Sequence, residues 1–542
     1  MKKLTYVFII LALCLCALML TSCEKTYEIT YELDGGVNST ENPSEYQKGE
    51  IVKLNFPKKE GYMFAGWYSE PEHENLIMEI NADTKDDITF YARWENVEDV
   101  LTFELVEDLG AERRFTYSVT DCVETAKFVI IPERYNNRSV TYVGSSAFEN
   151  CEQLEYVYIA DTIFDIENAA FSNCKALKEI NIPDKVSTID NYAFQNCDSL
   201  KEVTLGKNTY RIGQCAFADC DSLTKVNFFE ETYIYFGDYA FSNCDSLKEI
   251  ELNKVGSFSL NAFDGCDSLE KIVIHNCYRS LSLHMDVFND CPAFKEVVLG
   301  DDARMRSYSY GPPTIEKITV SENNKYIMSV DGVVYSKDGK ELICYPKGKK
   351  DKEFTVPIGV THINSKAFSG NEYIESVTIP DGVEYIGADT FSKCTNLKSI
   401  VISDSVTEIG ARAFANCSSL KTVKLSNSIE KINASTFSSC SALEIIKIPE
   451  GVRVIEANAF YNCISLQSIT IPYGVESIGI WSFGYCSLLK SITIPNSVIH
   501  MEASAFEGTP LAVYCEAEAQ PDSWDDEWAR DVKEVIWGYK GN

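Results

Sequence analysis

Phenylalanine recurs at a fixed interval of 23 residues over two long stretches of this chain. Between the two stretches the interval is kept within two residues. A fixed period of this length predicts a solenoid, in which each coil of the chain contacts only its two neighbours. The periodic residues are Phe148, Phe171, Phe194 and Phe217, then Phe241, Phe263 and Phe288, and finally Phe368, Phe391, Phe414, Phe437, Phe460, Phe483 and Phe506.

One coil can be followed from Leu466 to Cys486. Its first part alternates apolar and polar residues as far as Pro472, which predicts a short β-strand that ends at the proline. A second apolar pair, Val475 and Ile478, then returns to the core, and Phe483 points inward from a tight bend. Each coil therefore adds one strand to a continuous parallel sheet, with neighbouring strands about 4.8 Å apart.

Twelve cysteines share one position in the coil, three residues after the phenylalanine. A zinc site needs ligands that converge on one point, whereas this pattern spreads the sulfurs along a line. Disulfides between adjacent coils are disfavoured because in-register Cβ atoms lie too far apart. We therefore expect a ladder of packed thiols. It comprises Cys151, Cys174, Cys197, Cys220, Cys244, Cys266, Cys291, Cys394, Cys417, Cys440, Cys463 and Cys486.

The repeated pattern Leu-x-x-Ile-x-Ile-Pro-x-x-Val-x-x-Ile-Gly-x-x-Ala-Phe-x-x-Cys runs over roughly residues 128–515. It resembles the BspA-type leucine-rich repeats of bacterial surface proteins. The resemblance implies a mostly β, curved solenoid with a parallel sheet. One interruption, between Phe288 and Phe368, contains an Asp331-Gly332 turn between apolar runs, which predicts a hairpin insert at about residues 300–350 within one solenoid.

The first residues have the pattern of an export signal. A short basic start precedes an apolar run from Leu4 to Leu20, and Leu20-Thr21-Ser22-Cys23 places small residues before a cysteine. This resembles the lipobox of bacterial lipoproteins, which implies a signal peptide at 1–22, lipid attachment at Cys23 and a tether at 23–26. An uncleaved signal anchor is the alternative, since the apolar run approaches spanning length.

Residues 27–95 form a separate module. Tyr-x-Leu-Asp-Gly-Gly, Gly-Tyr-x-Phe-x-Gly-Trp-Tyr and Phe-Tyr-Ala-Arg-Trp follow one another in it. They resemble the internalin B-type, or Listeria–Bacteroides, repeat, which implies a small β-grasp-like domain that acts as a spacer in surface proteins. Trp67 and Trp94 could stack on carbohydrate, but we expect them to fill the small core.

The remaining boundaries follow from where the repeat begins and ends. Residues 97–142 are expected to be an N-terminal cap of the solenoid, residues 143–515 the repeats, and residues 516–542 a C-terminal cap. Trp524, Trp528 and Trp537 are expected to cover the open end of the core. A tryptophan-rich ligand site is the alternative interpretation of these three residues.

The net charge of −32 argues against nucleic-acid binding, which requires clustered lysine and arginine. It also leaves the lipid anchor as the only expected contact with a membrane. Catalytic motifs and a phosphate loop are missing from the sequence, so we expect no enzyme and no cofactor. His275 and His284 flank Cys277 and could ligate a metal, but they fall in an irregular coil, and no metal site is predicted.

The outward positions of the strands are expected to line one broad face, of the kind that solenoids use to bind proteins. Tyr156 and Tyr158 are an aromatic pair on this face and are the predicted ligand contacts. The family resemblance implies an exported protein, lipid-anchored at the bacterial cell surface, that binds a protein of the host matrix or of other cells. The alternative is a glycan-binding component for polysaccharide capture.

Overall fold

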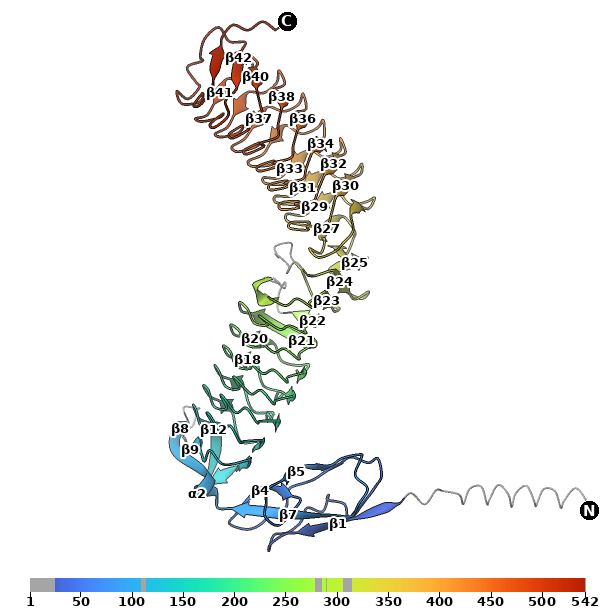
Figure 1. Ribbon diagram of the computed structural model, residues 1–542, viewed down its shortest axis with the longest axis vertical. Helices are drawn as coiled ribbons and strands as arrows, with labels where there is room; N and C mark the ends of the chain where they lie inside the picture. Colours follow the sequence, from blue (N-terminus) through green and yellow to red (C-terminus); the bar gives the residue numbers. More distant parts are fainter. Residues whose placement is uncertain (1–24, 109–113, 278–284, 289, 306–313, 542) are drawn as a thin grey trace, which may run out of the picture.

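The computed structural model describes residues 25–108, 114–277, 285–288, 290–305 and 314–541. The described chain is nearly all β-structure and forms a long rod of stacked coils, with a small β domain at its N-terminal end (Figure 1). Strands in successive coils pair in parallel at a spacing of 23 residues, as in Ser399↔Thr422 and Thr188↔Arg211. The predicted fold class is therefore confirmed.

The N-terminal domain has a five-stranded sheet in the order β2-β1-β7-β4-β5. β1 and β7 are parallel, and the other neighbours are antiparallel. Trp67 and Phe90 are fully buried between its strands, which is the core role expected for Trp67. The strands are β1 (Thr26–Glu32), β2 (Glu45–Gln47), β3 (Val52–Lys53), β4 (Met63–Tyr68), β5 (Leu76–Ile77), β6 (Glu79–Ile80) and β7 (Ile88–Glu95).

The solenoid begins with the short helix α2 (Val97–Val100) and an antiparallel pair, β8 (Leu101–Asp108) and β9 (Arg114–Cys122). From there each coil contributes a strand to one row, here called the strand face. This row comprises β10 (Phe128–Ile131), β13 (Tyr156–Ile159), β15 (Glu179–Ile180), β17 (Glu202–Thr204), β19 (Lys225–Asn227), β21 (Glu249–Phe258), β22 (Lys271–Cys277), β23 (Glu296–Leu299), β24 (Lys317–Val320), β28 (Glu353–Thr355), β30 (Ser376–Ile379), β32 (Ser399–Ile402), β34 (Thr422–Lys424), β36 (Ile445–Lys447), β38 (Ser468–Thr470), β40 (Ser491–Ile494), β42 (Ala512–Cys515) and β43 (Glu534–Ile536).

A second row of very short strands closes each coil. The repeat strands of this row hold the second residue of the apolar pair that follows the proline turn, such as Ile478. Apart from its first strand, which is antiparallel to the second, the row pairs in parallel like the first row. They are β11 (Arg134–Tyr135), β12 (Arg138–Val143), β14 (Asp165–Ile166), β16 (Thr188–Ile189), β18 (Arg211–Ile212), β20 (Ile234–Phe236), β29 (His362–Ile363), β31 (Tyr385–Ile386), β33 (Glu408–Ile409), β35 (Lys431–Ile432), β37 (Val454–Ile455), β39 (Ser477–Ile478) and β41 (His500–Met501). The short helix η1 (Met285–Phe288) lies between β22 and β23.

The periodic phenylalanines stack along the axis of the rod. Successive ring centroids from Phe148 to Phe288, and again from Phe368 to Phe506, are 4.7 to 5.6 Å apart. Each ring is almost fully buried. Burying one such ring contributes roughly 1.5–3 kcal/mol, so the stack supplies much of the cohesion between coils.

The ladder cysteines have a hydrogen-bonding role that the sequence pattern did not reveal. Each Sγ from Cys174 onward donates to the carbonyl oxygen of the phenylalanine in the preceding coil, at 3.0 to 3.3 Å. In the last coil Thr509 stands at the cysteine position, and its Oγ1 donates to the Phe483 carbonyl at 2.7 Å. The position therefore requires a small buried donor, which explains why a thiol recurs there.

This role predicts an order of stability for substitutions at Cys417. Burial raises the pKa of its thiol well above the usual value, so the S–H that donates to the Phe391 carbonyl is retained. We expect Cys417→Ala to destabilise the protein by about 1–2 kcal/mol and Cys417→Ser, which keeps a donor, by less. Urea unfolding of both variants measures the difference, and a serine variant less stable than the alanine variant would show that the sulfur acts only as apolar filling.

Two residues in nearly every described coil adopt the left-handed backbone conformation. They lie two positions before and two positions after the periodic phenylalanine, as in Asn458 (φ 57°) and Asn462 (φ 58°) around Phe460. This conformation costs a residue other than glycine roughly 1–2 kcal/mol, and asparagine tolerates it best. Asparagines recur at the second of these positions and bond to one another, with Asn173 Nδ2 donating to Asn150 Oδ1 at 2.9 Å.

The predicted hairpin is present in the middle of the rod. β25 (Ile327–Val330) and β26 (Val333–Ser336) pair antiparallel around Asp331 and Gly332, both of which have positive φ. β27 (Glu341–Cys344) continues from them into the second row. The hairpin separates a first block of coils, from Phe148 to Phe288, from a second block, from Phe368 to Phe506. Alternate residues of β26 join different apolar clusters, since Val334 belongs to the cluster of the first block and Val333 to the cluster of the second. The rod changes direction near this hairpin (Figure 1).

Tryptophan side chains lie against the last phenylalanine of the stack. The Trp528 ring packs edge-on to Phe506, with a centroid separation of 6.1 Å, and is 1% exposed. Trp524 packs against Trp528 at 5.0 Å and donates from Nε1 to the Val498 carbonyl. Trp537 contacts both of these rings. The three side chains therefore shield the C-terminal end of the apolar core from water.

Candidate binding surfaces

In the first block of coils the strand face is charged but internally paired. Lysine and glutamate alternate at the same strand position, so an ion pair bridges adjacent coils. The pairs are Lys225–Glu202 at 3.1 Å, Lys271–Glu249 at 2.8 Å and Lys317–Glu296 at 3.1 Å. Exposed pairs of this kind contribute about 0–1 kcal/mol each. They leave this part of the face with little charge to offer a partner.

The second block has a different strand face. Serine and threonine fill most of its outward positions, and two exposed aliphatic residues interrupt them, Val401 (46% exposed) and Ile445 (62%). Lys424 and Lys447 end the adjacent strands β34 and β36, whose register aligns Val423 with Ile446. The two lysines are thus stacked in register, and no described carboxylate lies within ion-pair distance of either one. Like charges in direct register are destabilising, so this pair is costly for the fold alone.

Tyr156 and Tyr158, the predicted ligand contacts, lie where the N-terminal domain docks on the strand face. Phe56 of that domain packs against Tyr158 and Phe128 with centroid separations of 5.4 Å to each. Tyr156 is half-buried against the same domain, and burial raises the pKa of its hydroxyl. Tyr158 keeps 42% of its surface exposed. The docking contact gives both residues a packing role, and their contact with an external ligand stays a prediction.

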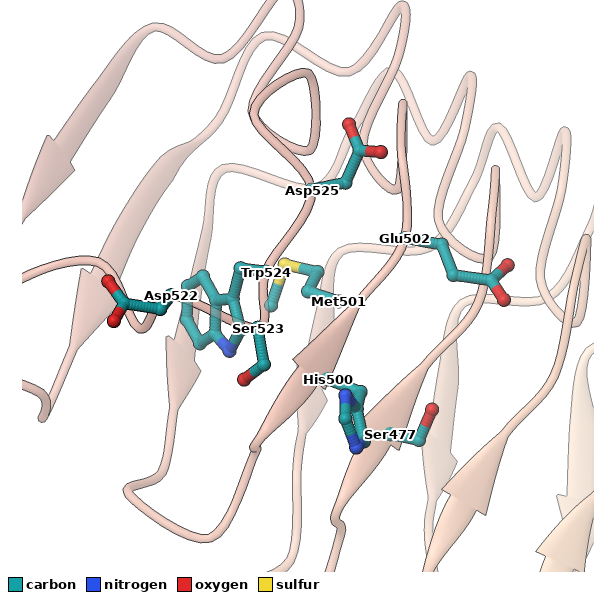
Figure 2. A pocket seen from close by; sticks show the side chains of 8 residues that line it. All are labelled: Ser477, His500, Met501, Glu502, Asp522, Ser523, Trp524 and Asp525. Atoms are coloured by element: carbon teal, nitrogen blue, oxygen red, sulfur yellow. The ribbon is translucent and has the colours of Figure 1, made fainter.

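A hollow of about 450 Å³ lies where the second strand row ends at β41. Its lining includes His500, Glu502, Asp522 and Asp525, which come from β41 and from the C-terminal segment beside it. Figure 2 shows the three carboxylates pointing in different directions, so they do not converge on one point. Paired carboxylates do acid–base chemistry only when both reach the same reacting group. The hollow is therefore a polar groove without a catalytic arrangement.

A second hollow, of about 490 Å³, lies at the junction between the N-terminal domain and the solenoid. Phe64 and Trp94 line it from the domain, and Ile130 lines it from the first solenoid strand. Lys59 lies over the Tyr62 ring and bonds to Asp34, so its charge is already neutralised. Trp94 is half-buried, and its Nε1 donates to the Leu33 carbonyl at 2.8 Å, which fits the structural role expected for it.

Several predictions made from single residues fall outside the described chain. Cys23, the predicted lipid attachment site, and the signal segment 1–22 are among the undescribed residues, as is His284. His275 bonds to Glu251, with 2.7 Å between Nε2 and Oε1. Within the described ranges no three His, Cys, Asp or Glu side chains form a group that could hold a metal. No helix among the described residues has the length and apolar character required to cross a membrane.

Sequence reasoning missed one exposed aromatic group. Trp481 and Tyr485 flank Phe483 and occupy the two left-handed positions of its coil. They are 39% and 44% exposed. The same positions hold Asn458 and Asn462 in the preceding coil and Ser504 and Gly508 in the next, so an alignment of the coils by their left-handed positions would have revealed the two rings.

Two family models match the sequence, one over the coils and one over the N-terminal domain. Residues 131–235, 222–330, 344–465 and 407–515 match the BspA type leucine rich repeat region, and residues 27–93 match the Listeria-Bacteroides repeat domain. No curated protein matches the chain.

Several solved structures are similar. A leucine-rich repeat protein from Bacteroides ovatus is 24% identical with a TM-score of 0.43, over 77% of this chain and 98% of that one. One from Eubacterium ventriosum is 23% identical with a TM-score of 0.45, over 79% and 95%. A leucine rich cell surface protein from Faecalibacterium prausnitzii is 21% identical with a TM-score of 0.31, over 81% and 93%. The repeat-family model matches well over half of the residues of this chain, so the chain belongs to the BspA-type leucine-rich repeat family.

Proposed function

We propose that this chain is an exported bacterial surface protein, attached to the membrane by a lipid at Cys23, whose solenoid binds other proteins. Adhesion to host matrix proteins or to neighbouring cells would be the result of that binding. The role is one of binding rather than catalysis, because the described surfaces offer long faces and no converging catalytic groups. The family supports this proposal, since its repeats build scaffolds whose extended faces bind macromolecules.

The observation that carries the proposal is the strand face of the second block. There the fold keeps Lys424 and Lys447 stacked, with no described carboxylate at ion-pair distance, next to the exposed side chains of Val401 and Ile445. The first block shows that an outward position two residues earlier in the strand accepts alternating charges. A partner that brings carboxylates to the two lysines would remove their repulsion and bury the aliphatic side chains. Tyr158 is a further proposed contact at the N-terminal end of the face.

A binding experiment with residues 24–542 tests this proposal. We expect the chain to bind at least one protein in a panel of matrix proteins and to bind no member of a glycan array through this face. The double substitution Lys424→Ser and Lys447→Ser is expected to weaken protein binding about tenfold, mainly through loss of charge complementarity.

The matched control is Lys225→Ser, which removes an exposed lysine from an outward position of the strand face in the first block, where an ion pair already neutralises it. Equal loss in the control and in the double variant would locate binding elsewhere on the rod. A chain that bound only glycans would instead support the alternative of polysaccharide capture.

A further inference from the structure

We propose that the bend around Phe483 carries a second docking site, which takes a basic segment of a protein partner by placing Lys or Arg side chains over Trp481 and Tyr485. The proposal rests on the protein-binding function above and assigns it a surface separate from the strand face. This surface, here called the aromatic bend, consists of Trp481, Tyr485, Tyr461 and Glu507.

The first observation is the backbone conformation of the two rings. Trp481 (φ 52°) and Tyr485 (φ 58°) both occupy left-handed positions, which favour asparagine and glycine. Tyr192 and Tyr239 also occupy the first such position in their coils, but among the described coils only that of Phe483 has an aromatic residue at both. The fold imposes this conformation from coil to coil, so what distinguishes this coil is that both positions hold large exposed rings.

The second observation is that the neighbouring coils hold the rings in place. A Cβ atom on Gly508 would lie 2.7 Å from Cδ1 of Tyr485, so only glycine leaves room for that ring to rest on the next coil. The Tyr461 ring packs edge-on to Tyr485 at 5.4 Å. Trp481 Nε1 donates to Glu507 Oε2 at 3.0 Å, which fixes the indole. Rings that are ordered before binding lose less conformational entropy when a partner arrives.

The third observation is the charge around the rings. The hydrogen bond that Trp481 donates lowers the pKa of Glu507, because it stabilises the ionised carboxylate. Glu502 accepts from the Ile480 amide, and Asp531 accepts from the Gly508 amide. The charge of Arg530 also lowers the pKa of Glu507.

Aromatic faces beside carboxylates attract ammonium and guanidinium groups through cation–π and ionic contacts together. The same carboxylates would repel an anionic glycan, and a neutral one would gain nothing from them. The net charge of −32 would also speed the approach of a basic partner. The site therefore favours a basic protein segment over a carbohydrate.

The test uses residues 24–542 and a short synthetic peptide rich in lysine and arginine, with an acetyl-lysine and citrulline version of the same peptide as the uncharged probe. Calorimetric titration at low and at high salt gives the affinities. The variant is Trp481→Asn with Tyr485→Asn, which installs the side chains found in the preceding coil. The control is Tyr192→Asn with Tyr239→Asn, which removes two aromatic residues from left-handed positions in the first block.

We expect the wild type and the control to bind the basic peptide, with an affinity that falls as salt rises. The aromatic-bend variant is expected to bind about tenfold more weakly or worse, and the uncharged peptide to bind to none of the proteins. Because asparagine relieves the left-handed strain, the variant should melt no lower than the wild type. Its loss of binding would then not reflect unfolding.

Three results would overturn the inference. The peptide could fail to bind the wild type, it could bind all three proteins equally as a general polyanion effect, or neutral dextran and xylan could bind at the rings without salt dependence. If a matrix protein bound the wild type and the aromatic-bend variant with equal affinity, this inference would be wrong, and the proposed function would still stand. Absence of binding to every protein in the panel would count against both.

Discussion

Replacing Phe414 with alanine is expected to destabilise the second block of coils by about 3–5 kcal/mol. The ring is fully buried and stacks between Phe391 at 5.4 Å and Phe437 at 5.3 Å. Its removal loses apolar burial and leaves a cavity that the two flanking rings cannot fill, because the backbone of each coil is fixed by hydrogen bonds to its neighbours. Urea unfolding followed by circular dichroism measures the loss.

The damage should stay local, because each coil contacts only adjacent coils. Hydrogen exchange is expected to quicken in the coils of Phe391, Phe414 and Phe437 and to remain unchanged around Phe171. Tyr473→Ala is the matched control, since that ring is 67% exposed and its loss should leave stability within experimental error. Faster exchange spread evenly over both blocks would contradict nearest-neighbour stacking.

A second large effect is expected at the C-terminal end of the stack. Trp528→Ala should destabilise the last coils by about 3–5 kcal/mol, since the indole is 1% exposed and covers Phe506. It should also expose the apolar end of the core to other molecules, which promotes association. Thermal unfolding and light scattering at several protein concentrations measure the two consequences.

Lys533→Ala, an exposed change in the same segment, is the control for this experiment. It should alter neither the melting temperature nor the scattering. A Trp528→Ala variant that melted like the wild type would show that Trp524 and Trp537 close the core without it.

The coil interior could be predicted from sequence because its signal is repeated many times. Phe391 and Cys417 are buried as their positions in the coil require, and the Asp331-Gly332 turn forms the expected hairpin. The donor role of the thiols was missed, since it depends on where the tight bend places the phenylalanine carbonyl. Thr509 was the clue, because it replaces cysteine with another donor in the last coil.

The surfaces were harder to predict because each occurs once. Docking of the N-terminal domain on Tyr156 depends on two modules meeting, and no periodic pattern records that contact. The sequence did hold one sign of this contact in β10, the first strand of the strand face. There Phe128 and Ile130 occupy outward positions that most later coils fill with charged or hydroxyl residues. The stacking of Lys424 on Lys447 likewise follows from the strand register, which sequence reasoning did not use.

The even spacing of the second block has a consequence for how such rods change length over evolution. From Phe391 to Phe483 every coil offers the same ring and the same thiol to the coil above and the coil below. A duplication or deletion of one whole unit would therefore leave both new junctions chemically equivalent to the old ones. The first block has unequal coil lengths around Phe241, Phe263 and Phe288, so the same event there would join mismatched neighbours. Gain and loss of units should thus concentrate on the C-terminal side of the hairpin.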